Sequence, residues 1–253
     1  MKLDRLISVL EAIAISRDCV SPSEIQKITG LPRPTCYRLL QILTDHQLLD
    51  KSAKSARYQI GTRLKQIVLM GQTDADVVNA ASPILQKAAN KFEEAIILSR
   101  TKKSYVEIIH IETPSNPSCS YVYPGLGYRP MHACSCSKAI AAFADEKFQE
   151  QILGGEMLSF TESTITTRAT LEQEFAHIRE IGYAECVEEF RKGVSSVAAP
   201  ISINNTGSGF SLGASGPSQK FDSNFRASMG QNLKKISLEV AQQLQIFQNF
   251  DSI

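Results

Sequence analysis

The sequence predicts an α+β fold in two parts, a small helical unit with a β-hairpin and a larger domain that combines an antiparallel sheet with helices. Three observations predict this fold. The chain has 253 residues, more than one small domain usually needs. The first 65 residues show the order helix, helix, tight turn, helix and hairpin. The remaining residues alternate short β-patterned runs with helical ones.

The charge is divided unevenly between these parts. The formal net charge of the chain is +1, but residues 1–65 carry 11 Lys and Arg against 6 Asp and Glu, a charge of +5, so residues 66–253 carry −4. A uniformly basic coat protein and an acidic tail are excluded. The asymmetry predicts a partner for the basic part, with an anionic polymer as the first candidate.

Three helices open the chain. Apolar residues at helical spacing predict the first over 3–15. A second begins at Ser21-Pro22, where a hydroxyl cap precedes proline, and stops at Gly30. The third begins near Pro34 or Thr35, since proline suits the first turn of a helix and not its interior.

Two short β segments follow, 47–50 and 57–60, joined by the basic loop 51–56. A hairpin after three helices is the arrangement of a winged helix-turn-helix. In that arrangement the third helix enters a DNA major groove with its N-terminal residues leading. The predicted DNA-contacting residues are Arg33, Thr35, Tyr37 and Arg38 on the third helix, and Lys51, Lys54 and Arg57 on the wing. The alternative is a three-helix interaction module whose arginines are merely solvated.

Two helices, 62–70 and about 75–92, lie between the hairpin and the larger domain. We expect the second to be interrupted or bent at Pro83. Together they form a predicted helical linker over 62–92, which could transmit a change of orientation from one domain to the other.

The larger domain begins with strands predicted at 95–100, 105–112 and 119–123. An alanine-rich helix at 139–144 and helices at 145–153 and 171–181 follow. Strands return at 183–187, 197–203 and 209–215, and a closing helix runs from 225 to about 247. This pattern is typical of an antiparallel sheet with flanking helices, as in sensor domains.

Several short stretches, in order and over more than 200 residues, resemble the IclR family of transcriptional regulators. The segment from Gly30 to Leu40 is similar to the recognition-helix region of the family, and 57–61 to the return strand of the wing. In the larger domain the similar stretches are Arg129-Pro130-Met131-His132-Ala133, Ser137-Lys138-Ala139, 178–183, Glu188-Glu189, Gly193-Val194, 198–201 and 215–217.

The resemblance implies three segments: a winged helix-turn-helix over 1–61, a helical linker over 62–92 and a GAF-like effector-binding domain over 93–253. It also implies a homodimer or dimer of dimers on a DNA operator, which the symmetry would make pseudo-palindromic. By binding to this regulator, a small organic molecule would control the expression of a catabolic gene cluster. The effector-binding positions that the resemblance gives are Met131, Ser135, Cys136, Cys186, Val194, Ser196, Gly213 and Ser215.

The sequence departs from the family pattern at several of these positions. Cys186 stands where an acid is frequent, Gly213 where a serine often lies, and Ser135 and Ser137 where small, glycine-rich residues are common. Pro34 replaces a serine at the start of the recognition helix. The pocket thus lacks a carboxylate, while the amides that open the helix near Ser135 favour an anion. We therefore expect an organic or aromatic acid as the effector.

The cysteines suggest two other interpretations. Cys134 and Cys136, with His132 and Cys186, could bind a metal, but a structural zinc site usually has two C-x₂₋₄-C pairs. Neutral cysteines that line the pocket are favoured, and we expect no metal or other cofactor. A cysteine nucleophile needs a basic partner such as His110, His132 or His177. No oriented set is evident, so we expect no catalytic residues, and a cysteine-dependent enzyme is the alternative.

Other short signals are weaker. The Gly207-Ser208-Gly209 run predicts a hairpin turn rather than a phosphate loop, because no helix with Lys-Ser/Thr follows it. Asp4 and Glu11 interrupt the apolar N-terminus, which argues against a signal peptide. No stretch approaches the ~18 apolar residues of a membrane span. We expect a cytoplasmic protein that needs no membrane partner.

Overall fold

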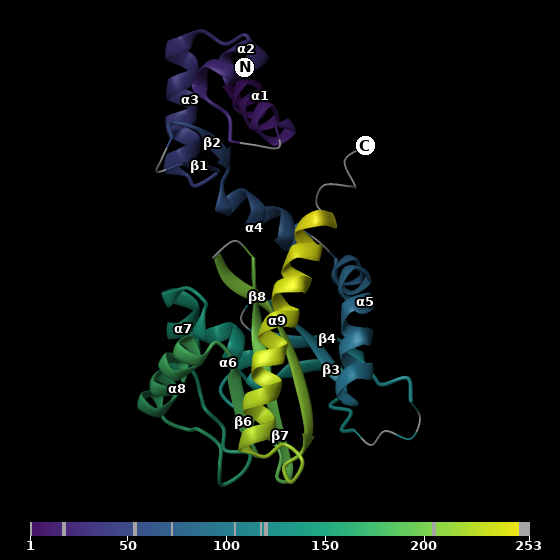
Figure 1. The fold of residues 1–253 in the computed structure, drawn as a ribbon. Helices are drawn as coiled ribbons and strands as arrows, with labels where there is room; N and C mark the ends of the chain where they lie inside the picture. Colours follow the sequence, from purple (N-terminus) through teal and green to yellow (C-terminus); the bar gives the residue numbers. More distant parts are fainter. Residues whose placement is uncertain are drawn as a thin grey trace. The chain divides into compact units, whose positions relative to one another are not determined.

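A computed structural model describes residues 2–16, 19–52, 55–71, 73–103, 105–116, 118, 121–203 and 206–247. The chain forms two compact units, Met1–Gln72 and Thr73–Ile253, whose elements are drawn in Figure 1. The boundary falls inside the segment 62–92, for which we expected a separate helical linker. The finer division at 61 and 92 stays a prediction.

The first unit contains the predicted three helices and hairpin. Its elements are α1 (Lys2–Ile15), α2 (Pro22–Thr29), α3 (Arg33–Asp45), β1 (Leu49–Lys51), β2 (Tyr58–Ile60) and α4 (Thr62–Gly71). β1 and β2 pair antiparallel, with Leu49 opposite Ile60. α3 begins slightly earlier than expected, at Arg33, and places Pro34 in its first turn, where no backbone N–H is needed.

Local chemistry explains where α2 begins and ends. The Ser21 hydroxyl accepts from the Glu24 amide, and the Glu24 carboxylate accepts from the Ser21 amide, which is a capping box. Gly30 ends the helix with a φ of +65°, a left-handed conformation that favours glycine. The buried residues of α1, α2, α3 and the hairpin form one core: Val9, Ile13, Val20, Ile25, Cys36, Leu39, Leu40, Leu43, Leu49 and Tyr58.

The second unit is built on a six-stranded antiparallel sheet in the order β5-β4-β3-β8-β7-β6. The strands are β3 (Ile96–Lys102), β4 (Tyr105–Glu112), β5 (Gly127–Arg129), β6 (Ala184–Val187), β7 (Val194–Ile203) and β8 (Thr206–Pro217). The helices are α5 (Asp74–Phe92), α6 (Ser135–Ala142), α7 (Glu146–Leu153), α8 (Arg168–Ile181) and α9 (Ser223–Phe247).

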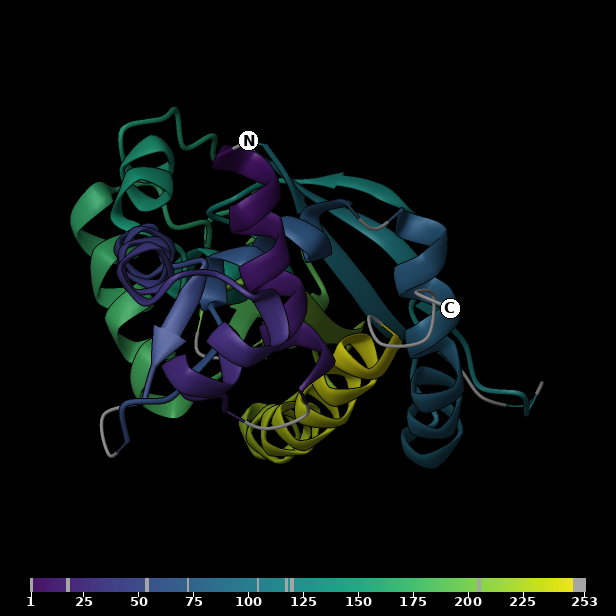
Figure 2. The same cartoon turned by 90° about the horizontal axis from the view of Figure 1, so that it is seen from above.

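Helices cover both faces of this sheet. α6 packs on one face and is itself covered by α7 and α8, while α5 and α9 lie on the other face. Figure 2 shows α8, in green, and α9, in yellow, on opposite sides of the strands. Cys136, Ala139, Phe175, Ile97 and Ala198 belong to the core on the α6 face. The predicted fold class, a helix-turn-helix unit followed by an antiparallel sheet with flanking helices, is confirmed.

Three details differ from the prediction. The strand expected at 119–123 is absent over 121–123, and residues 119 and 120 lie outside the described part of the chain. β5 takes its place because Gly127–Arg129 pairs with β4, opposite Val106–Ile108. α5 is continuous through Pro83, so the expected interruption is absent, while a bend at this residue stays a prediction. Residues 207–209 belong to β8 and not to a hairpin turn, since β8 begins at Thr206, which pairs with Ile203 of β7.

None of the helices in the described ranges is long and apolar enough to cross a membrane.

Candidate functional site

The first turns of α3 present a polar face opposite the buried one. Arg33, Tyr37 and Arg38 are exposed and Thr35 is half-buried, whereas Cys36 and Leu39 point into the core. The Arg33 guanidinium lies over the Tyr37 ring, 5.6 Å from its centroid. A cation on an aromatic face is restrained without losing its charge. The four residues predicted on this helix therefore form one surface.

The three residues predicted on the wing differ in their surroundings. Lys51 is exposed, and Lys54 lies outside the described residues. Arg57 Nε donates to the Cys19 carbonyl at 2.8 Å, and Arg57 Nη2 donates to Glu24 Oε2 at 3.0 Å. The same carboxylate caps α2, and its hydrogen bonds to Ser21, together with Arg57, lower the pKa of Glu24. Arg57 thus joins the wing to α2.

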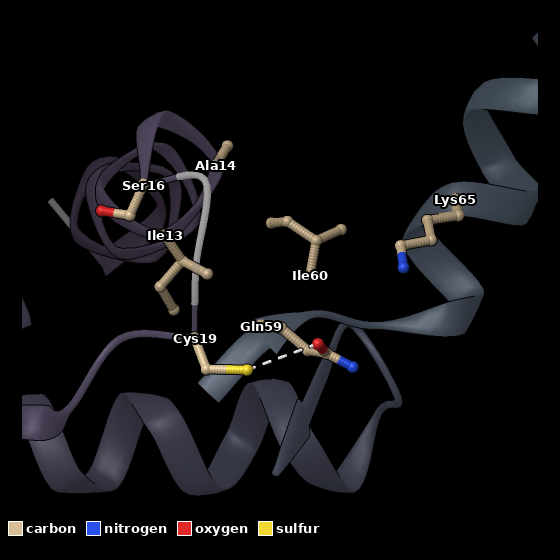
Figure 3. A pocket seen from close by; sticks show the side chains of 7 residues that line it. All are labelled: Ile13, Ala14, Ser16, Cys19, Gln59, Ile60 and Lys65. Carbon is tan, nitrogen blue, oxygen red and sulfur yellow. Dashed lines mark hydrogen bonds between the residues drawn. The ribbon is translucent and has the colours of Figure 1, made fainter. Parts of the chain in front are cut away.

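A hollow in the first unit lies between the end of α1, β2 and α4 (Figure 3). Its lining residues are Ile13, Ala14, Ser16, Cys19, Gln59, Ile60 and Lys65. The Cys19 thiol donates weakly to Gln59 Oε1 at 3.5 Å, and Lys65 supplies the only cation among these seven residues. The described lining therefore offers a single charge to orient a ligand.

The predicted effector-binding residues of the second unit gather on the α6 face of the sheet. Cys186 on β6 pairs with Ser196 on β7, and Ser196 pairs with Ser215 on β8, so the three side chains form a row. Ser135, the first residue of α6, meets this row: its Oγ lies 2.8 Å from Ser196 Oγ. Ser215 Oγ is buried without a hydrogen-bond partner among the described residues.

The start of α6 is suited to an anion. Cys134 occupies the N-cap position but makes no side-chain cap hydrogen bond, and the helix begins at Ser135, whose hydroxyl meets the serine row. Helix amides and hydroxyl donors together are a common arrangement for binding a carboxylate. Cys186 adds no charge, since burial raises the pKa of its thiol to about 12 and its Sγ donates to the Ala133 carbonyl.

Gly213 lies in the neighbouring row on the same face of the sheet, two residues along β8 from Ser215, and Cys136 lies against it. Gly213 on β8 pairs with Ala198, and a Cβ atom at this position would come 2.7 Å from Cys136 Sγ. The thiol therefore fills the space that a side chain at 213 would need. Of the remaining predicted residues, Met131 is half-buried and packs on the α6-face core, and Val194 is half-buried opposite Pro217.

A buried ion cluster beside this site has no predicted role. The Lys138 ammonium is fully buried in α6 and donates to Glu189 at 2.8 and 3.0 Å and to Glu174 at 2.9 Å. Burial alone would lower the pKa of Lys138, but the two carboxylates outweigh it and raise that pKa. The cluster joins α6 to α8 and to the turn after β6. Both Lys138 and Glu189 occur in motifs of the sequence, but neither pattern indicates that they meet.

Two further residues shape the surroundings of α6. The Arg129 guanidinium donates to four carbonyl groups, those of Pro124, Gly125, Gly127 and Tyr128, at 2.6 to 3.5 Å. The His132 ring donates from Nε2 to the Leu158 carbonyl at 2.9 Å and stacks on Phe160. The described hydrogen bonds include none from a histidine to a cysteine. Within the described ranges, no three His, Cys, Asp or Glu residues are placed to hold a metal ion.

The fold and these two sites define a class: a transcriptional regulator with a helix-turn-helix unit and a ligand-binding domain. The family model described as the IclR helix-turn-helix domain matches residues 2–53. The model described as the bacterial transcriptional regulator IclR C-terminal domain matches residues 72–242. The chain belongs to the IclR family of DNA-binding, ligand-responsive transcriptional regulators.

Individual relatives are distant but extend over most of the chain. The glycerol operon regulatory protein of Streptomyces griseus is 26% identical over 221 residues, 86% of this chain and 85% of its own. An IclR-type regulator from Silicibacter sp. TM1040 superimposes with a TM-score of 0.63 at 17% identity and covers 96% of both chains. An IclR homologue from Microbacterium hydrocarbonoxydans, solved with 4-hydroxybenzoate, gives a TM-score of 0.60 at 20% identity and covers 97% of this chain and 100% of its own.

Proposed function

We propose that this regulator binds a pseudo-palindromic operator as a dimer or dimer of dimers and that a small organic acid, bound where α6 meets the serine row, controls its DNA binding. The target would be a catabolic gene cluster, and the protein would act in the cytoplasm. The hydrogen bond between Ser135 and Ser196 carries this proposal, because it brings the first turn of α6 next to hydroxyls that include Ser215, which has no hydrogen-bond partner among the described residues.

The exposed face of α3 supports DNA recognition. Arg38 and Arg33 can donate in bidentate fashion to guanine, while Thr35 and the amides of the first turn can hold a phosphate. Lys51 and Lys54 are proposed phosphate contacts of the wing. Arg57 is also a proposed contact, although its guanidinium is shared with Glu24 and the Cys19 carbonyl.

Apolar side chains left exposed in the first unit support self-association. Leu3 and Ile7 on α1 are 63% and 43% exposed, and Ile67 and Val68 on α4 are 51% and 48% exposed. Contiguous exposed apolar groups commonly mark an interface. A two-fold dimer would place two α3 helices on the two half-sites of an operator.

An acid as the effector agrees with the local charge. Cys186 replaces a frequent acid of the family, which removes a source of repulsion, and its thiol is neutral at physiological pH. A structurally similar IclR homologue was solved with 4-hydroxybenzoate, and a sequence relative is described as a glycerol operon regulator. The first of these ligands is an aromatic acid, which supports an organic or aromatic acid as the effector here.

A thermal-shift screen against small organic acids, with the amides of the same acids as controls, tests the ligand class. We expect several acids to raise the melting temperature and their neutral amides to have no effect, since ligand binding stabilises the folded state. An acid that shifts the protein should then change its affinity for operator DNA in a fluorescence anisotropy titration. If only neutral compounds raise the melting temperature, the acid assignment is wrong.

A further inference from the structure

The segment 156–167, which we call the strap, connects α7 to α8. It follows the pair Gly154-Gly155 at the end of α7, and α8 begins directly after it at Arg168. The whole strap lies in the described part of the chain and contains neither helix nor strand. Its position therefore depends on the contacts that it makes with neighbouring segments.

Hydroxyl groups bind the strap to the turn that follows β6. Thr161 Oγ1 donates to the Glu188 carbonyl at 2.7 Å, and Thr164 Oγ1 donates to the Glu189 carbonyl at 2.6 Å. Among the described residues, no backbone-to-backbone hydrogen bond joins the strap to this turn. The attachment thus relies on side chains.

Aromatic rings connect the strap to the segment before α6 and to the same turn. His132 Nε2 donates to the Leu158 carbonyl at 2.9 Å, and the His132 ring stacks on Phe160 with the ring centroids 5.8 Å apart. The Phe160 ring also meets the Phe190 ring edge-on, at 5.1 Å between centroids. Because His132 precedes α6 and Phe190 follows β6, Phe160 bridges the two segments.

These two segments flank the proposed effector site. Cys186 Sγ on β6 donates to the Ala133 carbonyl at 3.3 Å, which joins the segment before α6 to the end of β6. Ser135, Cys186 and Ser215 are buried, and Ser196 is half-buried. An acid can therefore reach these side chains only after part of the surrounding chain has moved.

We propose that the strap is a lid, which detaches from the turn after β6, moves on Gly154-Gly155 as its hinge and admits small molecules to the serine row. Detachment breaks side-chain hydrogen bonds and ring contacts, and it leaves the strand pairings and helices intact. Water replaces such hydrogen bonds at low net cost, so a local opening needs much less free energy than unfolding. Glycine gives the hinge its freedom of backbone rotation. The role of the lid in effector binding rests on the proposed function, whereas the opening itself does not.

Alkylation of Cys186 tests the opening without an effector. Iodoacetate, a small organic acid, and iodoacetamide, its amide, modify a thiol only after they reach it, so the labelling rate in the folded full chain measures access to the site. Peptide mass spectrometry assigns the label to Cys186. We expect slow labelling whose rate changes little with urea below the unfolding transition, because a local opening exposes little surface. A rate that rises with the full urea dependence of unfolding would overturn the lid.

Removal of the two hydroxyls that hold the strap should increase access. Thr161→Val combined with Thr164→Val keeps the shape of both side chains but removes their hydrogen bonds. We expect this double variant to label at Cys186 about tenfold faster with both reagents, since the closed state loses two stabilising bonds. Ser163→Ala, an exposed position in the strap, should leave the rate unchanged. An unchanged rate in the double variant would contradict the proposal.

A matched control removes hydrogen bonds elsewhere in the same domain. Gln149 Nε2 donates to three carbonyls at and after the end of α6, those of Ala141, Ala142 and Ala144, at 2.9 to 3.3 Å. Gln149→Ala should lower stability without opening the lid, so Cys186 should label as slowly as in the unmodified chain. An equal rise in Gln149→Ala and in the double variant would also overturn the lid, because access would then follow a general loss of stability.

The two reagents separate the lid from the proposed acid site. If the site favours acids, the ratio of the iodoacetate rate to the iodoacetamide rate at Cys186 should exceed the ratio for N-acetylcysteine in solution. A ratio equal to or below that of N-acetylcysteine would contradict the acid site, and the urea dependence and the variants would still decide the lid.

Discussion

The Cys136 sulfur lies 2.7 Å from the point where a Cβ atom on Gly213 would stand. The departure from the family pattern at Gly213 is thus matched by Cys136: the glycine on β8 allows α6 to approach the sheet, and the thiol on α6 fills the space left by the missing side chain. Gly213 acts through packing, since its backbone pairs regularly with Ala198 and Ile97.

Gly213→Ser should destabilise the second unit by about 1–3 kcal/mol, because the new side chain overlaps the Cys136 thiol in a closely packed core. Chemical denaturation measures the change. Gly209→Ser, on the same strand but with nothing within 4 Å of its Cβ position, is the control and should have little effect. The double change Gly213→Ser with Cys136→Ala should recover most of the loss. Strict additivity of the two single effects would contradict the shared-space explanation.

Lys138→Met should cost about 3–5 kcal/mol of stability, because it leaves two carboxylates with their buried partner removed. Arg168→Met, which removes an exposed ion pair with Glu150, is the control and should leave the denaturation midpoint almost unchanged. If Lys138→Met is as stable as the unmodified chain, the ion pairs of Lys138 with Glu174 and Glu189 do not stabilise the fold.

The same cluster predicts a loss of stability at high pH. The pKa of Lys138 is raised in the folded state above its ordinary value of 10.5. Its contribution to the free energy of unfolding is therefore fully present below the unfolded pKa and is lost as the pH rises through the folded pKa. Urea midpoints recorded from neutral to alkaline pH should fall above about pH 10. This fall should be smaller in Lys138→Met, and an identical profile in both proteins would argue against the lysine as its source.

Arg38→Ala should weaken operator binding by about 1–3 kcal/mol while the second unit stays folded, since this exposed arginine is a proposed groove contact and takes no part in the core. Anisotropy titrations measure the affinity, and Arg191→Ala, an exposed arginine of the second unit, is the matched control. Binding should also weaken steeply with salt, because phosphate contacts release counterions. A flat salt response would favour the interaction-module alternative.

Ser135→Leu should abolish the acid-induced thermal shift and leave operator affinity intact, because the larger side chain blocks the junction of α6 and β7. Ser196→Ala, which removes only a hydroxyl, should weaken the shift without displacing α6. Ser163→Leu, at an exposed position, controls for the added apolar surface. An undiminished acid response in Ser135→Leu would place the effector elsewhere.

Much of the fold follows from local patterns. The 3.6-residue periodicity, the Ser21 cap and Gly30 locate the first helices to within a few residues, since these signals depend on neighbours in sequence. The strand expected at 119–123 is not formed over 121–123, because β propensity describes a segment and not its partner, and β4 pairs with 127–129 instead. The partner of Arg57 could not be predicted from local patterns either, because its ion pair with Glu24 joins residues that are 33 positions apart.

The sequence by itself determined the two-part organisation, the charge on the DNA-binding unit and the residues that line α6 and the strands facing it. The organisation and the charge depend on composition, periodicity and local spacing, whereas the residues near α6 come from the resemblance to the IclR family. Only the tertiary structure decided that Ser135 meets Ser196, that Cys136 occupies the space beside Gly213, and that Lys138 is neutralised by Glu174 and Glu189. Each pair is separated by more than 30 residues, so its contact exists only once the sheet register and the position of α6 are set.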